Sequence, residues 1–368
     1  MVKTPIVQFG TSRFLQAHVD LFVSEALESG AAIGPITIVQ TSGDASRARR
    51  LAALSAGFDI QVRGLRDGAR LDETRQVTSV ARAMSLAADF DAVRDLIVEE
   101  AEIILSNTAD AGFKPQAADI ATGFDHAMSY PAKLTHLLHA RFKANARPIQ
   151  IMPTELVQDN GTVLRGLVLE IASKMEPEFR EWLSTQVRWV NSLVDRIVSE
   201  PLEPAGAVAE PYALWAIEDC PGLVMPCQHA DVQRVKDLGV IERRKLFILN
   251  LGHTWMVSRW LANDRKGAVF VRDVMEDADF SALLRAVYSD EVLPAFKAAG
   301  EGDGVEDYIA ATLERFANPF LDHRLQDIAQ NHAEKLERRI TAFLDWARAK
   351  GDVSAKPELE KVTGRVGV

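Results

Sequence analysis

Three residues with acid–base and hydrogen-bonding chemistry, Lys245, Asn250 and His253, lie in the apolar, proline-free stretch 243–257. If this stretch is a helix, about 100° of rotation per residue places all three within an arc of roughly 140°. Their neighbours are mostly large and apolar, which indicates a helix buried nearly all round, so the polar groups need partners or a cleft. A lysine in such a place loses its proton more readily and can serve as a base near neutral pH. The alternative is that Lys245 ends a solvated basic run and His253 is a core histidine.

The amino-terminal half opens with the pattern of a dinucleotide-binding unit. Residues 6–9 form an apolar strand pattern, Gly10 interrupts it, and 13–27 carry an apolar stripe with helical spacing. In such a unit, backbone donors at the turn and at the helix amino terminus bind the cofactor pyrophosphate. The usual three-glycine pattern is incomplete, because Ser12 stands at the second position and the third glycine is missing. A plain strand, turn and helix remains the alternative.

The second predicted strand, 36–40, ends without the acidic residue that usually binds the adenosine ribose. Gln40 and Thr41 follow directly, and Asp44 comes later. Arginines at 47, 49 and 50 then begin a helix-like segment. Asp44 could reach the ribose, or an arginine could accept the 2′-phosphate of NADP; a solvated charged helix is the alternative for most of the arginines. The residues at this strand end leave both NAD and NADP open.

The remaining pattern predicts an α/β fold, with a Rossmann-type doubly wound sheet and a mostly helical carboxy-terminal domain. Residues 59–77 alternate apolar and polar side chains around Asp67-Gly68, which indicates a small antiparallel excursion. Apolar runs at 102–105 and 149–152 predict further buried strands. Prolines and a glycine between 201 and 211 mark a junction, so we expect domains at 1–203 and 204–368.

Composition narrows the class of protein. The 368 residues are 47% hydrophobic and 26% charged, with a formal net charge of −10, which gives no basic footprint for nucleic acid. No stretch approaches the roughly 18 uninterrupted apolar residues of a membrane span, and no signal-peptide pattern precedes the first strand. We therefore expect a cytoplasmic protein whose partner is a small molecule. The segment 220–231, with Cys220, Cys227 and His229, matches no standard zinc spacing, and two reduced thiols are the simpler interpretation.

Several of these segments together resemble one enzyme family, the polyol-specific long-chain dehydrogenases or mannitol dehydrogenases, and in particular its tagaturonate and fructuronate reductase branch. Lys-x4-Asn-x2-His at 245–253 is similar to the family's catalytic helix, and Gly10-Thr-Ser-Arg-Phe14 is similar to its phosphate loop. Residues 106–113 resemble its Ser-Asn-Thr-x-x-Ala-Gly string. Glu155-Leu156 with the following Asn160-Gly161 resembles the uronate reductase branch. Further similar strings lie at 194–197, 210–218 and 315–329.

The resemblance implies metal-independent hydride transfer between NAD and a ketohexuronate/hexonate pair, such as tagaturonate/altronate or fructuronate/mannonate. It implies Lys245 as general acid/base, Asn250 as the stabiliser of the developing alkoxide, and His253 as an orienting group. Leu156 replaces the second oxyanion asparagine of the polyol branch, which leaves Asn160 as a possible substitute. An uncharged polyol/ketose pair and a non-catalytic dinucleotide sensor are the alternative functions.

The same resemblance, with the Rossmann pattern, supplies the expected binding residues. Those for the cofactor are Gly10, Thr11, Ser12, Arg13, Phe14, Gln40, Thr41, Asp44, Asn107 and Thr108. Those for the substrate are Asn160, Asp195, Arg196, Arg315, His323 and Arg324. The three in the carboxy-terminal half are basic, and a planar guanidinium can hold a carboxylate with two hydrogen bonds, although each residue could equally be structural.

Overall fold

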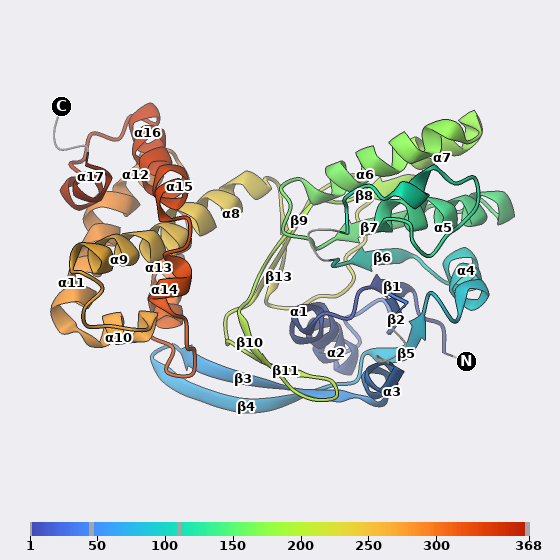
Figure 1. The fold of residues 1–368 in the computed structure, drawn as a ribbon, viewed down its shortest axis with the longest axis horizontal. Helices are drawn as coiled ribbons and strands as arrows, with labels where there is room; N and C mark the ends of the chain where they lie inside the picture. The colour runs from blue at the N-terminus through green and yellow to red at the C-terminus, as the bar shows by residue number, and fades with distance from the viewer. Residues whose placement is uncertain (1, 44–47, 109–111, 365–368) are drawn as a thin grey trace. The chain divides into compact units, whose positions relative to one another are not determined.

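The computed structural model describes residues 2–43, 48–108 and 112–364, and the chain divides into two compact units (Figure 1). The first unit comprises Met1–Val62, Glu73–Ala209 and Ala213–Leu238. The second comprises Arg63–Asp72, Glu210–Tyr212 and Gly239–Val368. The first unit therefore continues well beyond residue 203, where the prolines and the glycine suggested a junction.

A six-stranded parallel sheet forms the centre of the first unit. Its order is β5-β2-β1-β6-β7-β8, which along the chain is the 3-2-1-4-5-6 order of a doubly wound dinucleotide-binding fold. The strands are β1 (Ile6–Phe9), β2 (Ile36–Gln40), β5 (Val80–Ser85), β6 (Ile103–Ser106), β7 (Ile149–Pro153) and β8 (Val187–Trp189). Their short apolar runs follow from burial on both faces of the sheet. The predicted fold class is confirmed.

Helices and short helical turns connect these strands. Side chains of α4, α5, α6 and α7 form one core with strand residues such as Phe9, Ile104 and Ile151. The helical segments are α1 (Arg13–Leu15), η1 (Gln16–Asp20), α2 (Leu21–Glu28), α3 (Ala48–Ala56), α4 (Phe90–Glu99), η3 (Ala117–Ile120), α5 (Tyr130–Ala144), α6 (Asn160–Ile171), η4 (Ala172–Lys174) and α7 (Pro177–Thr185). The predicted helix near Ser129 is α5, which begins with the Ser129 side chain accepting a hydrogen bond from the Ala132 N–H.

The remaining strands form two smaller sheets. One has the order β10-β11-β3-β4 and the other β13-β12-β9. Their strands are β3 (Phe58–Arg66), β4 (Ala69–Val77), β9 (Ser192–Asp195), β10 (Val198–Pro201), β11 (Ala207–Ala209), β12 (Leu214–Glu218) and β13 (Val232–Val235). Asp67 and Gly68, both with positive φ, make the two-residue turn between β3 and β4. This hairpin is the excursion predicted for 59–77.

The second unit is helical, as expected, with a core that includes Trp255, Tyr288, Phe296 and Phe343. Its segments are α8 (Leu238–Arg244), η5 (Lys245–Asn250), α9 (Leu251–Ala262), α10 (Val271–Glu276), α11 (Ala278–Ala286), η6 (Val287–Val292), α12 (Leu293–Ala298), α13 (Val305–Phe316), α14 (Leu325–Ile328), α15 (His332–Leu336), η7 (Glu337–Thr341), α16 (Ala342–Ala349) and α17 (Pro357–Thr363). Within the described ranges, none of the helices combines the length and the apolar character needed to cross a bilayer.

Candidate active site

The turn after β1 depends on glycine at its first position. Gly10 has φ +123°, and a Cβ there would lie 2.6 Å from the carbonyl oxygen of Asn107, so the position requires glycine. Ser12, which stands where the usual motif has glycine, caps the following helix. Its hydroxyl accepts from the Leu15 N–H at 3.2 Å and donates to Asn107 Oδ1 at 3.0 Å. Serine therefore joins the two loops that end β1 and β6.

A cavity of about 500 Å³ opens beside this turn, at the carboxyl ends of β1, β2 and β6, where a doubly wound sheet binds its ligand. Seven of the residues expected to bind cofactor line it: Gly10, Thr11, Ser12, Gln40, Thr41, Asn107 and Thr108. The other three do not appear in its lining. Arg13 donates to the Gly206 carbonyl and to Glu203, the Phe14 ring stacks on His18 at 4.7 Å, and Asp44 lies outside the described residues.

Two cations line the cavity: Lys133, which was not predicted, and Arg50, one of the arginines considered for a 2′-phosphate. Lys133 is 8% exposed, and its Nζ donates to the Thr41 carbonyl at 3.3 Å. Burial lowers the pKa of Lys133, while Asp119 and Asp125 act in the opposite direction. Arg50 donates to the Thr11 carbonyl. A signal for Lys133 existed in the sequence, because a lysine in the first turn of a helix opposes the helix dipole unless an anion lies nearby.

Glu155, another residue not predicted as part of the site, connects the ends of β6 and β7. Its carboxylate accepts from the Ser106 hydroxyl at 3.1 Å, the Thr108 N–H at 2.9 Å and the Thr108 hydroxyl at 3.1 Å. Burial raises the pKa of Glu155, and these hydrogen bonds oppose that effect. Asn107 Nδ2 donates to the Thr154 carbonyl at 3.0 Å in the same connection. The sequence string around Glu155 carried the only signal for this role.

Asn160 is fully engaged with the main chain. Its Nδ2 donates to the carbonyls of Glu155 and Ser192 at 3.1 and 2.9 Å, and its Oδ1 accepts from two backbone N–H groups. The side chain is completely buried. Leu156, at the position of the family's second oxyanion asparagine, is 79% exposed.

Asp195 ends β9 and Arg196 follows it, and both side chains are buried. Arg196 Nη1 donates to the Ala17 carbonyl, and both residues act electrostatically on His18. Burial lowers the pKa of His18 to about 3, so this imidazole is neutral, with Nε2 hydrogen-bonded to the Leu214 carbonyl. Asp195 and Arg196 therefore lie near His18, a neutral buried histidine of η1.

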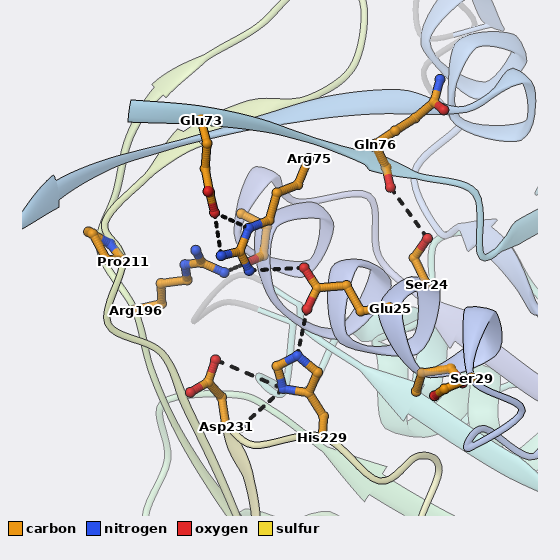
Figure 2. Close-up of polar contacts among 12 residues, drawn as sticks. Ser24, Glu25, Ser29, Glu73, Arg75, Gln76, Arg196, Pro211, His229 and Asp231 are labelled. Carbon is orange, nitrogen blue, oxygen red and sulfur yellow. Dashed lines mark hydrogen bonds and ion pairs between the residues drawn. The ribbon is translucent and has the colours of Figure 1, made fainter. Parts of the chain in front are cut away.

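In the segment 220–231, which was considered as a zinc site, His229 contacts protein groups. His229 Nε2 contacts Glu25 Oε2 at 2.6 Å, and Nδ1 accepts from the Asp231 N–H at 3.0 Å (Figure 2). Glu25 Oε1 also binds Arg75 at 2.9 Å. Both ring nitrogens of His229 thus have protein partners. Among the residues that the structure describes, there is no group of three or more histidine, cysteine, aspartate or glutamate side chains that could hold a metal ion.

In the second unit, α8, η5 and α9 follow one another without a break, and η5 is a π-helical turn from Lys245 to Asn250. A π turn pairs residues five apart, so Lys245 and Asn250 share one side more closely than α-helical spacing predicts. Single π turns inside α-helices occur frequently at functional sites. The expected burial of the surrounding residues is confirmed, since Ile248, Leu251, Trp255 and Met256 have no exposed surface.

His253 lies one turn further, 7% exposed, with its ring against Phe316 at 4.6 Å and His323 at 4.8 Å. Burial lowers the pKa of His253 well below its ordinary value, and four basic neighbours, led by His323, lower it further. His253 is therefore neutral, and its imidazole can accept one hydrogen bond and donate another. His323, one of the residues predicted to bind the substrate, thus lies beside His253.

The two arginines of that set lie differently. Arg315 holds Glu210 with two hydrogen bonds, Nε to Oε2 at 3.0 Å and Nη2 to Oε1 at 2.8 Å, and also lies over the Tyr212 ring. Its side chain is 4% exposed and that of Glu210 is 1% exposed. Arg324 is exposed and lies 5.7 Å from the Phe270 ring. The carboxylate that Arg315 binds in this unit is a protein carboxylate.

Both halves of the chain match known proteins. Residues 4–224 match the family model of the mannitol dehydrogenase Rossmann domain, and residues 237–357 match that of the mannitol dehydrogenase C-terminal domain. An altronate oxidoreductase of Bacillus subtilis is 30% identical over 374 residues, which cover 95% of this chain and 76% of the relative.

Two solved structures share the fold. A substrate-free D-sorbitol dehydrogenase has a TM-score of 0.84 at 22% identity, covering 99% of this chain and 80% of the other. Mannitol 2-dehydrogenase of Pseudomonas fluorescens, in complex with NAD and D-mannitol, has a TM-score of 0.71 at 20% identity, covering 99% and 78%. Because both domain models match and a relative at 30% identity aligns with 95% of this chain, the chain belongs to the mannitol dehydrogenase family.

Proposed function

We propose that the chain transfers hydride between NAD and a secondary alcohol or ketone of a sugar acid, in the manner of the altronate oxidoreductases it is similar to. Its family makes it a dehydrogenase that acts on CH–OH groups. The observation that carries the proposal is the π turn that sets Lys245 and Asn250 on one side of a buried helix, one turn before neutral His253.

The residues of the first unit fit a dinucleotide. Gly10, where a Cβ would clash with the Asn107 carbonyl, lets the turn lie close to the end of β6, and Lys133 presents a buried side chain to the cavity. A pyrophosphate would receive backbone N–H groups from the turn and charge from Lys133. We assign NAD rather than NADP because Gln40 and Thr41, at the end of β2, carry no charge to meet a 2′-phosphate, and Arg50 of the lining donates to the Thr11 carbonyl. When bound, the nicotinamide supplies the hydride acceptor.

In the proposed oxidation, the Lys245 amine takes the proton of the substrate hydroxyl while hydride leaves the carbon that bears this hydroxyl. In reduction, the Lys245 ammonium returns the proton to the oxygen. The Asn250 amide donates a hydrogen bond to the oxygen on which negative charge develops. Neutral His253 orients a neighbouring hydroxyl of the substrate. We give Asn160 a structural task instead, because both of its N–H groups already donate to main-chain carbonyls.

The test is oxidation of NADH and NADPH by a panel of ketohexuronates and uncharged ketoses, followed by nicotinamide absorbance. We expect turnover of an acid with NADH as the better cofactor. Lys245→Ala is expected to lower kcat by roughly 10²- to 10⁴-fold, the contribution of a positioned general base, and to leave NADH affinity unchanged. Turnover of fructose equal to that of the acids would support a polyol enzyme instead. Cofactor binding without turnover of any member of the panel would support a sensor.

A further inference from the structure

Arg339 reaches the helix that carries Lys245, Asn250 and His253 from a different helical segment. It lies on η7, and its Nη1 donates to the Thr254 hydroxyl at 3.2 Å. Thr254, the residue after His253, in turn donates to the Asn250 carbonyl at 2.9 Å. A single hydroxyl group therefore separates the Arg339 guanidinium from the main chain of Asn250. All of these residues belong to the second unit.

The surroundings of Arg339 carry an excess of basic groups. Lys335 and Arg339 both act electrostatically on His253 and on His332, and Arg339 also acts on Lys335. Lys335 donates to the Ile328 carbonyl at 2.8 Å, and the His332 ring contacts the Ser258 hydroxyl at 3.0 Å.

Two acids also act there, Asp327 on His323 and Glu334 on Lys335. Glu334 has its own ion pair with Arg338 at 3.3 Å. In the described part of the chain, neither Lys335 nor Arg339 forms an ion pair.

Other arginines of this unit differ from Arg339 in having carboxylate partners. Arg243 binds Glu301 at 2.7 Å, Arg259 binds Glu358 at 2.8 Å, and Arg315 binds Glu210 at 2.8 Å. Arg339 is partly buried, and burial together with Arg338 lowers its pKa. Cations removed from water without a counterion are costly, and an anion that enters the site removes that cost.

We propose that Arg339 binds the carboxylate of the sugar acid and thereby selects acids over uncharged sugars, an inference that rests on the proposed function. A guanidinium fits a carboxylate with two parallel hydrogen bonds, and Arg339 keeps N–H groups beyond the one given to Thr254. Lys335 adds positive charge at the same place. Arg315 has no part in this recognition, because Glu210 occupies its guanidinium.

The experiment compares Arg339→Gln with Arg338→Gln, a neighbouring exposed arginine paired only with Glu334. For Arg339→Gln we expect kcat/KM for the ketohexuronate to fall roughly 10- to 150-fold, mainly through KM, as for loss of a hydrogen bond to a charged group. The inhibition constant of the hexonate product rises by the same factor. NADH affinity, the melting temperature and any turnover of uncharged ketose stay unchanged, and Arg338→Gln behaves as wild type. Arg339→Lys, which keeps the charge, is expected to lie between.

The outcomes separate the two proposals. If the wild-type protein turns over no ketohexuronate, the proposed function fails. If it does, and Arg339→Gln or Arg339→Lys keeps the wild-type KM and hexonate inhibition, the carboxylate assignment to Arg339 is wrong. Should Arg339→Gln lose NADH binding and melt early, Arg339→Lys decides: a folded lysine variant with an unchanged KM for the acid overturns the proposal.

Discussion

The buried pair of Glu210 and Arg315 allows a quantitative test of whether Arg315 serves the fold of the second unit rather than the substrate. The two side chains are nearly inaccessible and share two hydrogen bonds. Glu210→Leu removes the carboxylate and leaves the guanidinium buried without its partner. Breaking a buried ion pair in this way costs about 3–5 kcal/mol of unfolding free energy. For a unit of this size, that loss lowers the melting temperature by about 10–20 °C.

The double variant Glu210→Leu/Arg315→Met removes both charges and keeps apolar volume. Replacing both members of a buried pair is often neutral or stabilising, so we expect the double variant to melt well above the single variant. Differential scanning calorimetry is the suitable assay, because a protein of two compact units need not unfold in one transition.

Two results would refute this reasoning. A loss below about 1 kcal/mol for Glu210→Leu, the scale of an exposed pair, would show that the pair is not desolvated in solution. A folded double variant whose KM for the acid substrate rises more than tenfold would show that Arg315 binds the substrate after all. An unchanged KM in the double variant is the expected result.

Two further predictions concern the first unit. Lys133→Met is expected to weaken NADH binding roughly 10- to 150-fold in a fluorescence titration, because the substitution removes a charged partner of the cofactor. Lys143→Met, at an exposed position on the same helix, is the control and leaves NADH affinity unchanged. Equal NADH affinities for the two variants would show that Lys133 does not bind the cofactor. Burial raises the pKa of Asp20 from its ordinary value of 3.8 to about 8, so its favourable contribution is complete below the unfolded pKa and is lost as pH rises toward 8. Asp20→Asn should therefore raise the melting temperature at pH 8 but hardly at pH 4, and an equal effect at both would contradict the assignment.

Much of the first unit was predictable from the sequence. The apolar runs at β1, β2, β6 and β7 stand out because parallel strands are buried on both faces, and glycine, proline and polar residues bound them sharply. The turn after β1 was equally visible, because Gly10 interrupts an apolar strand, and φ at Gly10 is +123°. These features depend on neighbouring residues, which a sequence displays directly.

Contacts between distant residues were not predictable in the same way. Glu210 and Arg315 are 105 positions apart, and Ser106 reaches Glu155 across 49. No local pattern indicates which of many charged residues will be paired, so nothing in the sequence distinguishes Arg315 from Arg339 as a ligand for the substrate. The π turn was hidden as well, because periodicity assigns one rotation to every residue of a helix.

The π turn between Lys245 and Asn250 also depends on residues that never touch substrate. Winding the same residues as an ordinary α-helix would turn everything after Asn250 by about 100° relative to α8. Trp255 and Met256, which are fully buried, would then leave the core, at a cost of several kcal/mol. The packing of Trp255 and Met256 in the hydrophobic core therefore prevents the π turn from rewinding as an α-helix. It holds the wide turn open and so sets the spacing between the proposed base and its amide partner.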